Sequence, residues 1–136
     1  VDLQPEEDDD LFLKTKEHSI DLIRLITPTT DEERLKTILN NASGFLYYVS
    51  IAGITGSKRP EINEVETAVQ EIKTKTNIPI GVGFGIRTKE DIERVGSFAD
   101  GVIVGSVLVD IIKNNEHESS VKDKIMKKVR EFASAV

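Results

Sequence analysis

Short runs of apolar, mostly β-branched residues alternate along this chain with longer segments in which apolar residues recur every three or four positions. The first pattern is typical of strands and the second of amphipathic helices, so their alternation predicts βα units around a parallel sheet. Each expected strand is apolar or small throughout because both faces of a parallel sheet are covered. The four strands are expected at residues 21–27, 45–50, 78–83 and 101–105.

Helices are expected before the first strand, at residues 6–18, and after each of the four strands. The later helices follow residues whose side-chain oxygens accept a hydrogen bond from a free backbone N–H group at a helix start. The expected N-caps are Thr30 with Glu33, Asn63, Thr88 with Asp91, and Ser120 with Asp123. The apolar residues expected to face inward are Leu35, Ile38 and Leu39, then Val65, Val69 and Ile72, then Ile92, Val95 and Phe98, and finally Ile125, Val129 and Phe132.

Composition narrows the classes of function. The 136 residues, 38% of them hydrophobic, fit one ordinary globular domain, and the chain has no cysteine for a disulfide or a zinc–thiolate site. His18 and His117 lie far apart in polar surroundings, so a metal site is not expected. A net charge of -6 argues against nucleic acid as a partner. The apolar runs are shorter than the ~20 residues of a membrane-spanning helix, and we expect a cytoplasmic protein.

The ends of the chain favour a fragment. The sequence starts at Val1, and its only methionine is Met126. The opening helix at residues 6–18 has no strand before it, as though that strand belonged to a preceding segment. We therefore expect residues 1–136 to be part of a single domain, without an internal linker.

Glycine-rich segments follow three consecutive strands, at residues 53–56, 81–86 and 101–106. Taken singly, each of them is explained equally well by a tight turn. Together they lie at the carboxyl ends of the strands, where β/α barrels bind phosphate with the last loops and a short extra helix. Residues 106–113 are the candidate for that helix. Glycine lets the backbone N–H groups approach an anion closely, so the site needs no basic side chain.

The strand at 45–50 places its two tyrosines on opposite faces, so only one of Tyr47 and Tyr48 can line a pocket. A strand tyrosine is more often a packing residue. In the next strand, one face has almost no side chains and the other is filled by isoleucine and valine. The first face consists of Pro79, Gly81, Gly83 and Gly85, and the second of Ile78, Ile80 and Val82. The glycine face is expected to leave room for a ligand.

Residues 43–50 with Gly53–Gly56, residues 81–86 and residues 99–106 closely resemble the tryptophan synthase alpha chain, in matching order and spacing. Residues 2–7 are similar to the loop after the fourth strand of that family. The resemblance implies an α/β fold of the (β/α)8 TIM-barrel type, of which this chain supplies the C-terminal half, strands 5 to 8 with their helices.

The resemblance also implies an activity in L-tryptophan biosynthesis. The family's lyase reaction is the aldol-type cleavage of indole-3-glycerol phosphate to indole and glyceraldehyde 3-phosphate. The indole passes to a beta chain that contains pyridoxal phosphate, within an alpha2beta2 tetramer. No cofactor is expected in this chain.

Site residues follow from the same resemblance. By this resemblance, Tyr47 lines the substrate cavity, and Thr55 and Gly56 belong to the loop after strand six. Phe84 packs near the indole, and the phosphate is held by Gly85, Gly105 and Ser106. Asp2 is a candidate for communication with the partner. Ile51 and Gln4 depart from the family, which often has arginine and proline there. No catalytic residue is expected here, because the acid/base glutamate and the aspartate that orients the indole belong to the missing N-terminal half.

Two alternatives stay open. One is a stand-alone phosphate-binding half-barrel without lyase activity. The other is a different phosphate-binding barrel of amino-acid biosynthesis, which shares the glycine pattern after strands seven and eight. The stretches Tyr47–Ser50 and Gly53–Gly56 argue against this second alternative.

Overall fold

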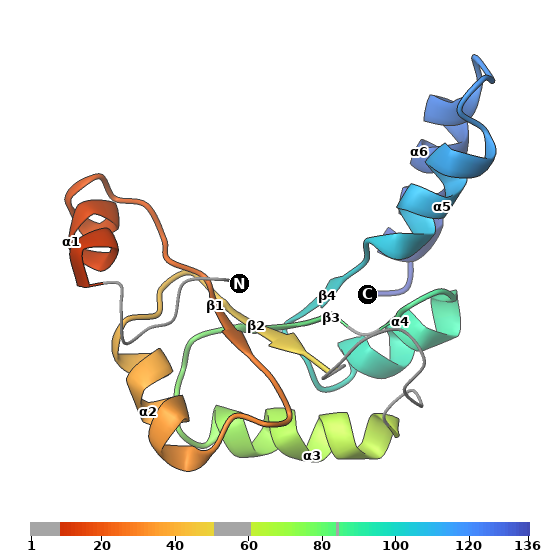
Figure 1. Cartoon of the computed structure of the whole chain (residues 1–136). Helices are drawn as coiled ribbons and strands as arrows, with labels where there is room; N and C mark the ends of the chain where they lie inside the picture. The colour runs from red at the N-terminus through yellow and green to blue at the C-terminus, as the bar shows by residue number, and fades with distance from the viewer. Residues whose placement is uncertain (1–8, 51–60, 84) are drawn as a thin grey trace.

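The computed structural model describes residues 9–50, 61–83 and 85–136 and contains a single four-stranded parallel sheet (Figure 1). The strands lie in the order β1-β2-β3-β4, so each strand is hydrogen-bonded to the next one along the chain. The elements are α1 (Asp9–Glu17), β1 (Arg24–Ile26), α2 (Glu32–Asn40), β2 (Leu46–Val49), α3 (Ile62–Lys73), β3 (Ile80–Gly83), α4 (Lys89–Gly96), β4 (Gly101–Ile103), α5 (Ser106–Asn114) and α6 (Val121–Ala133). All four predicted strands and the α/β class are confirmed.

The hydrophobic core lies between the sheet and helices α2, α3 and α4, which cover one of its faces (Figure 1). Leu46, Ile80 and Val82 point into it from the strands and have no exposed surface. Burying a side chain of this size contributes about 1.5–3 kcal/mol, so this layer dominates the stability of the sheet. The predicted inward-facing residues of α3 and α4 are all buried, and those of α2 are buried or partly buried.

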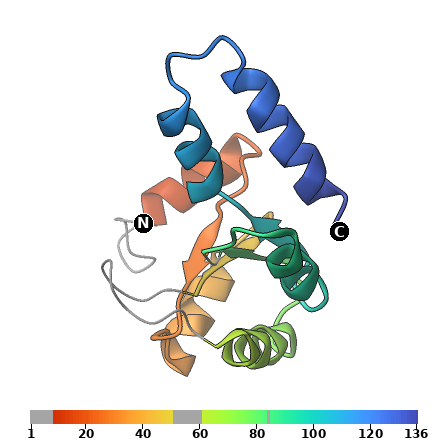
Figure 2. The same cartoon turned by 90° about the vertical axis from the view of Figure 1, so that its right-hand side faces the viewer.

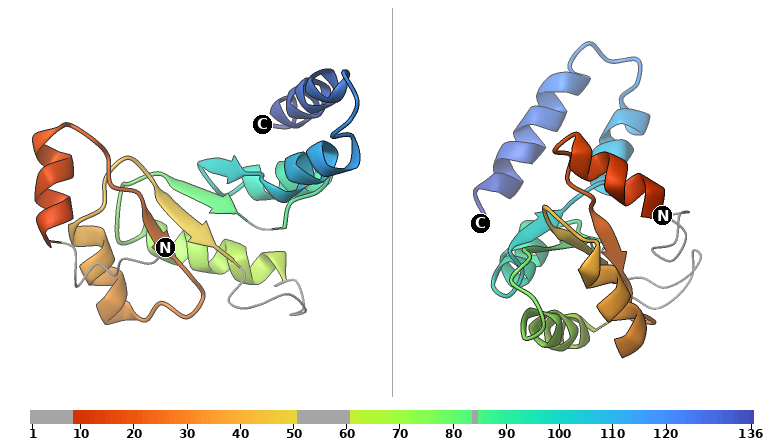
Figure 3. Two further views of the ribbon diagram at one scale, coloured as in Figure 1. Left: turned by 45° about the horizontal axis from the view of Figure 1, so that its top comes forward. Right: turned by 90° about the vertical axis from the view of Figure 1, so that its left-hand side faces the viewer.

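Helices α5 and α6 pack side by side and project from the β4 end of the sheet (Figures 2 and 3). The predicted buried stripe of α6 is therefore only partly correct. Phe132 is buried, whereas Val129 is 39% exposed because this part of α6 lies away from the sheet. Within the described residues, no helix is both long enough and apolar enough to cross a membrane.

Helix α4 begins as the sequence predicts. Thr88 Oγ1 accepts a hydrogen bond from the N–H of Asp91 at 3.1 Å, and the Asp91 carboxylate accepts one from the N–H of Thr88 at 3.0 Å. This reciprocal capping box satisfies two backbone donors that have no partner within the helix.

The other three predicted caps need correction. At α2 the N-cap is Asp31, whose Oδ1 accepts from the N–H of Arg34 at 2.8 Å, while Thr30 Oγ1 accepts from the N–H of Thr27 at 3.1 Å. Asn63 lies inside α3, whose N-cap position is occupied by a glutamate that makes no side-chain cap. Ser120 occupies the N-cap position of α6 as predicted, but its hydroxyl donates to a nearby glutamate and makes no side-chain cap.

The described part of the opening helix is α1, which ends at a left-handed residue. Ser19 has a φ of 55°, a conformation that glycine adopts far more readily. Its N–H donates to the Lys16 carbonyl at 3.2 Å, and the N–H of Ile20 donates to the Thr15 carbonyl at 2.9 Å. These bonds close the end of the helix in the manner of a Schellman motif and turn the chain toward β1.

Candidate functional site

The carboxyl ends of the four parallel strands meet at one edge of the sheet, and the predicted site residues that the structure describes lie there or on the sheet face beneath it. Register pairs Tyr47 of β2 with Gly81 of β3, and Gly81 with Gly101 of β4. The sheet face opposite the core therefore bears a tyrosine beside two glycines. Sequence reasoning located this face correctly.

The two tyrosines of β2 point to opposite faces, as predicted. Tyr48 is 3% exposed and belongs to the core, where burial and then the charge of Glu64 raise its pKa. Tyr47 is half-buried on the other face. Of the two, only Tyr47 lies on the face opposite the core, and its role in lining a cavity stays a prediction.

The ring of Tyr47 crosses β3 at Gly83. A Cβ atom added at Gly83 would lie 2.4 Å from both Cε2 and Oη of Tyr47. One at Gly81 would lie 3.0 Å from Cδ1 of Ile103 and 3.3 Å from the ring of Phe45. The glycines thus make room for side chains of neighbouring strands, and not for a ligand as the sequence suggested.

The start of α5 is the open part of this edge. Helix α5 was predicted at residues 106–113 and is found at Ser106–Asn114. Gly105 occupies its N-cap position, and a Cβ added there would meet no atom of the described residues within 4 Å. The first N–H groups of a helix have no acceptor within it and lie at the positive end of its dipole, so they attract an anion. Gly85, which follows β3, has a φ of 35° and is half-buried.

Several predicted residues lie outside the described residues. They are Asp2, Gln4, Ile51, Thr55, Gly56 and Phe84. The structure thus places Tyr47, Gly85, Gly105 and Ser106, and the roles given to all of these residues stay predictions.

Sequence reasoning missed an ion pair near this edge. Arg87 Nη1 lies 3.7 Å from Asp110 Oδ2 and joins the segment before α4 to helix α5. Both side chains are about half-exposed. The two residues belong to different elements, and no local pattern in the sequence indicates that they meet.

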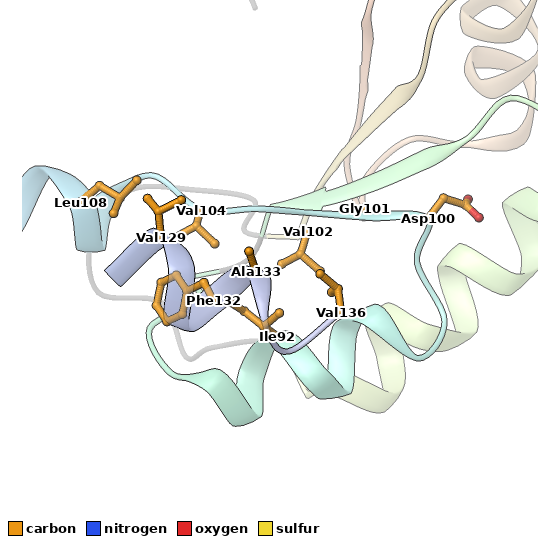
Figure 4. A pocket seen from close by; sticks show the side chains of 10 residues that line it. All are labelled: Ile92, Asp100, Gly101, Val102, Val104, Leu108, Val129, Phe132, Ala133 and Val136. Atoms are coloured by element: carbon orange, nitrogen blue, oxygen red, sulfur yellow. The ribbon is translucent and has the colours of Figure 1, made fainter. Parts of the chain in front are cut away.

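A groove of about 350 Å³ lies elsewhere, between β4, α4, α5 and α6 (Figure 4). Its walls are mostly apolar and include Val102, Val129 and Phe132, and the charged residue Asp100 lies at one end. The predicted site residues that the structure describes, Tyr47, Gly85, Gly105 and Ser106, do not line it. In the described part of the chain, no group of three or more potential metal ligands occurs, and both histidines are exposed.

Asp100 stabilises the end of β4 that is remote from α5. Its carboxylate accepts hydrogen bonds from the N–H of Ile80 and from Nζ of Lys73, both at 2.9 Å. The Ile80 N–H bond, followed by the lysine, lowers the pKa of Asp100. In return, the N–H of Asp100 donates to the Ile80 carbonyl at 2.9 Å, so β3 and β4 are joined by two bonds at their start.

Comparison with known proteins identifies relatives of the whole chain. The family model described as tryptophan synthase alpha chain matches residues 1–136. Tryptophan synthase subunit alpha from Legionella pneumophila str. Paris is 35% identical, with a TM-score of 0.85 over 99% of this chain and 49% of that one. Mycobacterium tuberculosis tryptophan synthase is 31% identical, with a TM-score of 0.85 and the same coverage.

A chain from Aquifex aeolicus VF5 is 31% identical, with a TM-score of 0.82 over 99% of this chain and 48% of that one. The present chain thus spans about half the length of the solved structures that it matches, and its four parallel strands correspond to about half of their barrel. The match along its full length shows that this chain belongs to the tryptophan synthase alpha chain family.

Proposed function

We propose that this chain forms the C-terminal half of a tryptophan synthase alpha barrel and contributes its phosphate-binding part. The observation that supports this best is the open, glycine-preceded start of α5 at the carboxyl edge of the sheet, in a chain that matches the family over residues 1–136. In β/α barrels, phosphate is commonly bound by the loops after the last two strands and by the N-terminus of a short extra helix. Helix α5, placed between β4 and the longer α6, fits that extra helix.

The substrate in this proposal is indole-3-glycerol phosphate. Backbone N–H groups at Gly85, Gly105 and Ser106 bind its phosphate, and Tyr47 lines the cavity beside the glycerol and indole parts. Thr55 and Gly56 belong to the loop over the site, and Phe84 packs near the indole. Binding through backbone N–H groups suits this chain because its net charge of -6 gives no general attraction for anions.

The cleavage step needs groups from elsewhere. Aldol-type cleavage moves protons, and a general acid or base must lie within hydrogen-bond reach of the reacting atom. We assign the acid/base glutamate and the orienting aspartate to the other half of the barrel. The 136-residue chain alone should therefore release no indole above the buffer background, and adding the complementary half should restore activity. The beta chain, with its pyridoxal phosphate, receives the indole in the alpha2beta2 complex.

A second candidate is a phosphate-binding half-barrel that has no lyase activity. It is favoured by the fact that β3, β4 and α5, which provide the proposed phosphate ligands, all lie within this chain. Restoration of indole release by the complementary half separates the two candidates. Phosphate binding without any restored activity supports the half-barrel.

The phosphate site can be tested with inorganic phosphate and the isotopically labelled 136-residue chain. We expect the amide signals of Gly85, Gly105 and Ser106 to shift together. Gly105→Val should weaken binding, because its side chain fills the space that is open among the described residues at this position. Lys113→Gln is the control and should have a smaller effect. Unshifted amides, or the opposite ranking of the two variants, would contradict the proposal.

A further inference from the structure

The proposed phosphate ligands come from two separate segments. Gly85 lies between β3 and α4, and Gly105 and Ser106 lie at the start of α5. Hydrogen bonds to one phosphate group require donor–acceptor distances of about 2.7–3.2 Å from both segments at once. The spacing of the two segments therefore affects how well they bind one anion together.

The first segment is fixed to α4. Ile86 is 2% exposed and belongs to the core. The Asp91 carboxylate accepts hydrogen bonds from the N–H of Arg87 at 2.9 Å and from that of Thr88 at 3.0 Å. The backbone just after Gly85 thus has little freedom relative to α4.

Helix α5 is held less firmly. None of its side chains is fully buried, and Val109 and Ile112 are 60% and 48% exposed. Val107 packs against the core but is only partly buried, so core packing fixes α5 less firmly against the segment before α4 than a buried contact would. Arg87 joins that segment to α5, with its Nη1 3.7 Å from Oδ2 of Asp110, which lies one turn into α5.

We propose that the Arg87–Asp110 ion pair is a positioning device that holds the start of α5 at the spacing from Gly85 that phosphate binding requires. The inference rests on the proposed function, because it takes the phosphate site as given. In this proposal Arg87 and Asp110 do not contact the anion. They affect its binding by setting the spacing between the two glycine segments that do.

The size and the direction of the change in phosphate affinity make this role testable. An ion pair this exposed is worth at most about 1 kcal/mol, which is a factor of about five in a dissociation constant. A positioning role predicts that Arg87→Gln and Asp110→Asn both weaken phosphate binding by about two- to fivefold. An effect of charge alone predicts that the two variants change phosphate affinity in opposite directions. Arg87→Gln would weaken binding, whereas Asp110→Asn would strengthen it, because it removes a carboxylate near an anion.

The experiment titrates inorganic phosphate into the 136-residue chain and four variants, following the amides of Gly85 and Gly105, with thermal unfolding measured in parallel. The variants are Arg87→Gln, Asp110→Asn, the exchange Arg87→Asp with Asp110→Arg, and the control Glu93→Gln. Glu93 pairs with Lys89 at the same 3.7 Å, with similar exposure, but within α4. The control should therefore leave the dissociation constant unchanged.

We expect both single variants to bind more weakly and the exchange to restore binding, without a matching change in melting temperature. Tighter binding by Asp110→Asn, or no restoration by the exchange, would overturn the positioning role while leaving the phosphate site intact. If the unaltered chain showed no phosphate shifts at Gly85 and Gly105, the proposed function would fail, and this inference with it.

Discussion

Replacing Gly83 with alanine should destabilise the fold through Tyr47. The new Cβ would lie 2.4 Å from the tyrosine ring, whereas ordinary contacts begin at 3.4 Å, so about 1 Å of movement is needed. Packed side chains accommodate such an insertion by off-rotamer conformations and backbone shifts, at about 1–3 kcal/mol. The Tyr47 ring is half-buried and can move, so the cost should lie near the lower value. At about 2–8 °C per kcal/mol for domains near this size, the melting temperature should fall measurably.

Urea unfolding of three variants isolates the contact. Gly101→Ala is the matched control, because a Cβ there would meet its nearest neighbour, Cα of Gly81, at an ordinary 3.9 Å. It should be neutral or slightly stabilising, since alanine restricts the unfolded chain. In the double variant Gly83→Ala with Tyr47→Val the clash is absent. The loss of unfolding free energy in the double variant should therefore be at least ~1 kcal/mol smaller than the sum of the losses in Gly83→Ala and Tyr47→Val.

Additive costs, or a Gly83→Ala chain as stable as the original, would refute this reasoning. Either result would mean that the ring of Tyr47 does not lie over Gly83 in solution. The proposed wall of the substrate cavity would then need to be drawn differently.

Three further predictions concern the stability of the chain. Ser19→Gly should stabilise it by about 0.5–1 kcal/mol, measured by urea unfolding, because glycine relieves the left-handed strain at the end of α1. Thr88→Ala should cost about 0.5–2 kcal/mol in the same assay, whereas Thr30→Ala, which removes no cap of α2, should cost less. The hydrogen bond from the Ile80 N–H lowers the folded-state pKa of Asp100 below its ordinary value of 3.8, so the stability that this carboxylate contributes is present above that value and is lost as pH falls through the folded-state pKa. The melting temperature of the original chain should therefore fall more steeply in acid than that of Asp100→Asn.

The elements of this fold are predictable from the sequence because their signals are local. Each strand is a short apolar run between polar segments, and Thr88 with Asp91 lies directly before an amphipathic stretch. The cap of α2 was misplaced by one residue because Thr30 and Asp31 are both good capping residues. The backbone N–H of Thr27 engages the Thr30 hydroxyl, which leaves the cap to Asp31.

The site was predictable only in part. The alternation along β2 gives the direction of Tyr47, and the glycines give the open edge. The position of the Tyr47 ring over Gly83 depends on the register of β2 and β3. The approach of Arg87 to Asp110 depends on how the segment before α4 packs against α5. Such contacts are tertiary, and no single stretch of sequence contains them.

The residues that flank the two ends of strand β4 are under different constraints. At its start, Asp100 exchanges hydrogen bonds with Ile80 and fixes the strand to its neighbour. Just past its end, no atom in the described part of the chain lies within 4 Å of the position that a side chain at Gly105 would take. Substitutions at the second end can thus alter what the chain binds without removing the bonds on which folding depends. Ligand preference can therefore diverge among relatives of this chain while the sheet that presents it stays the same.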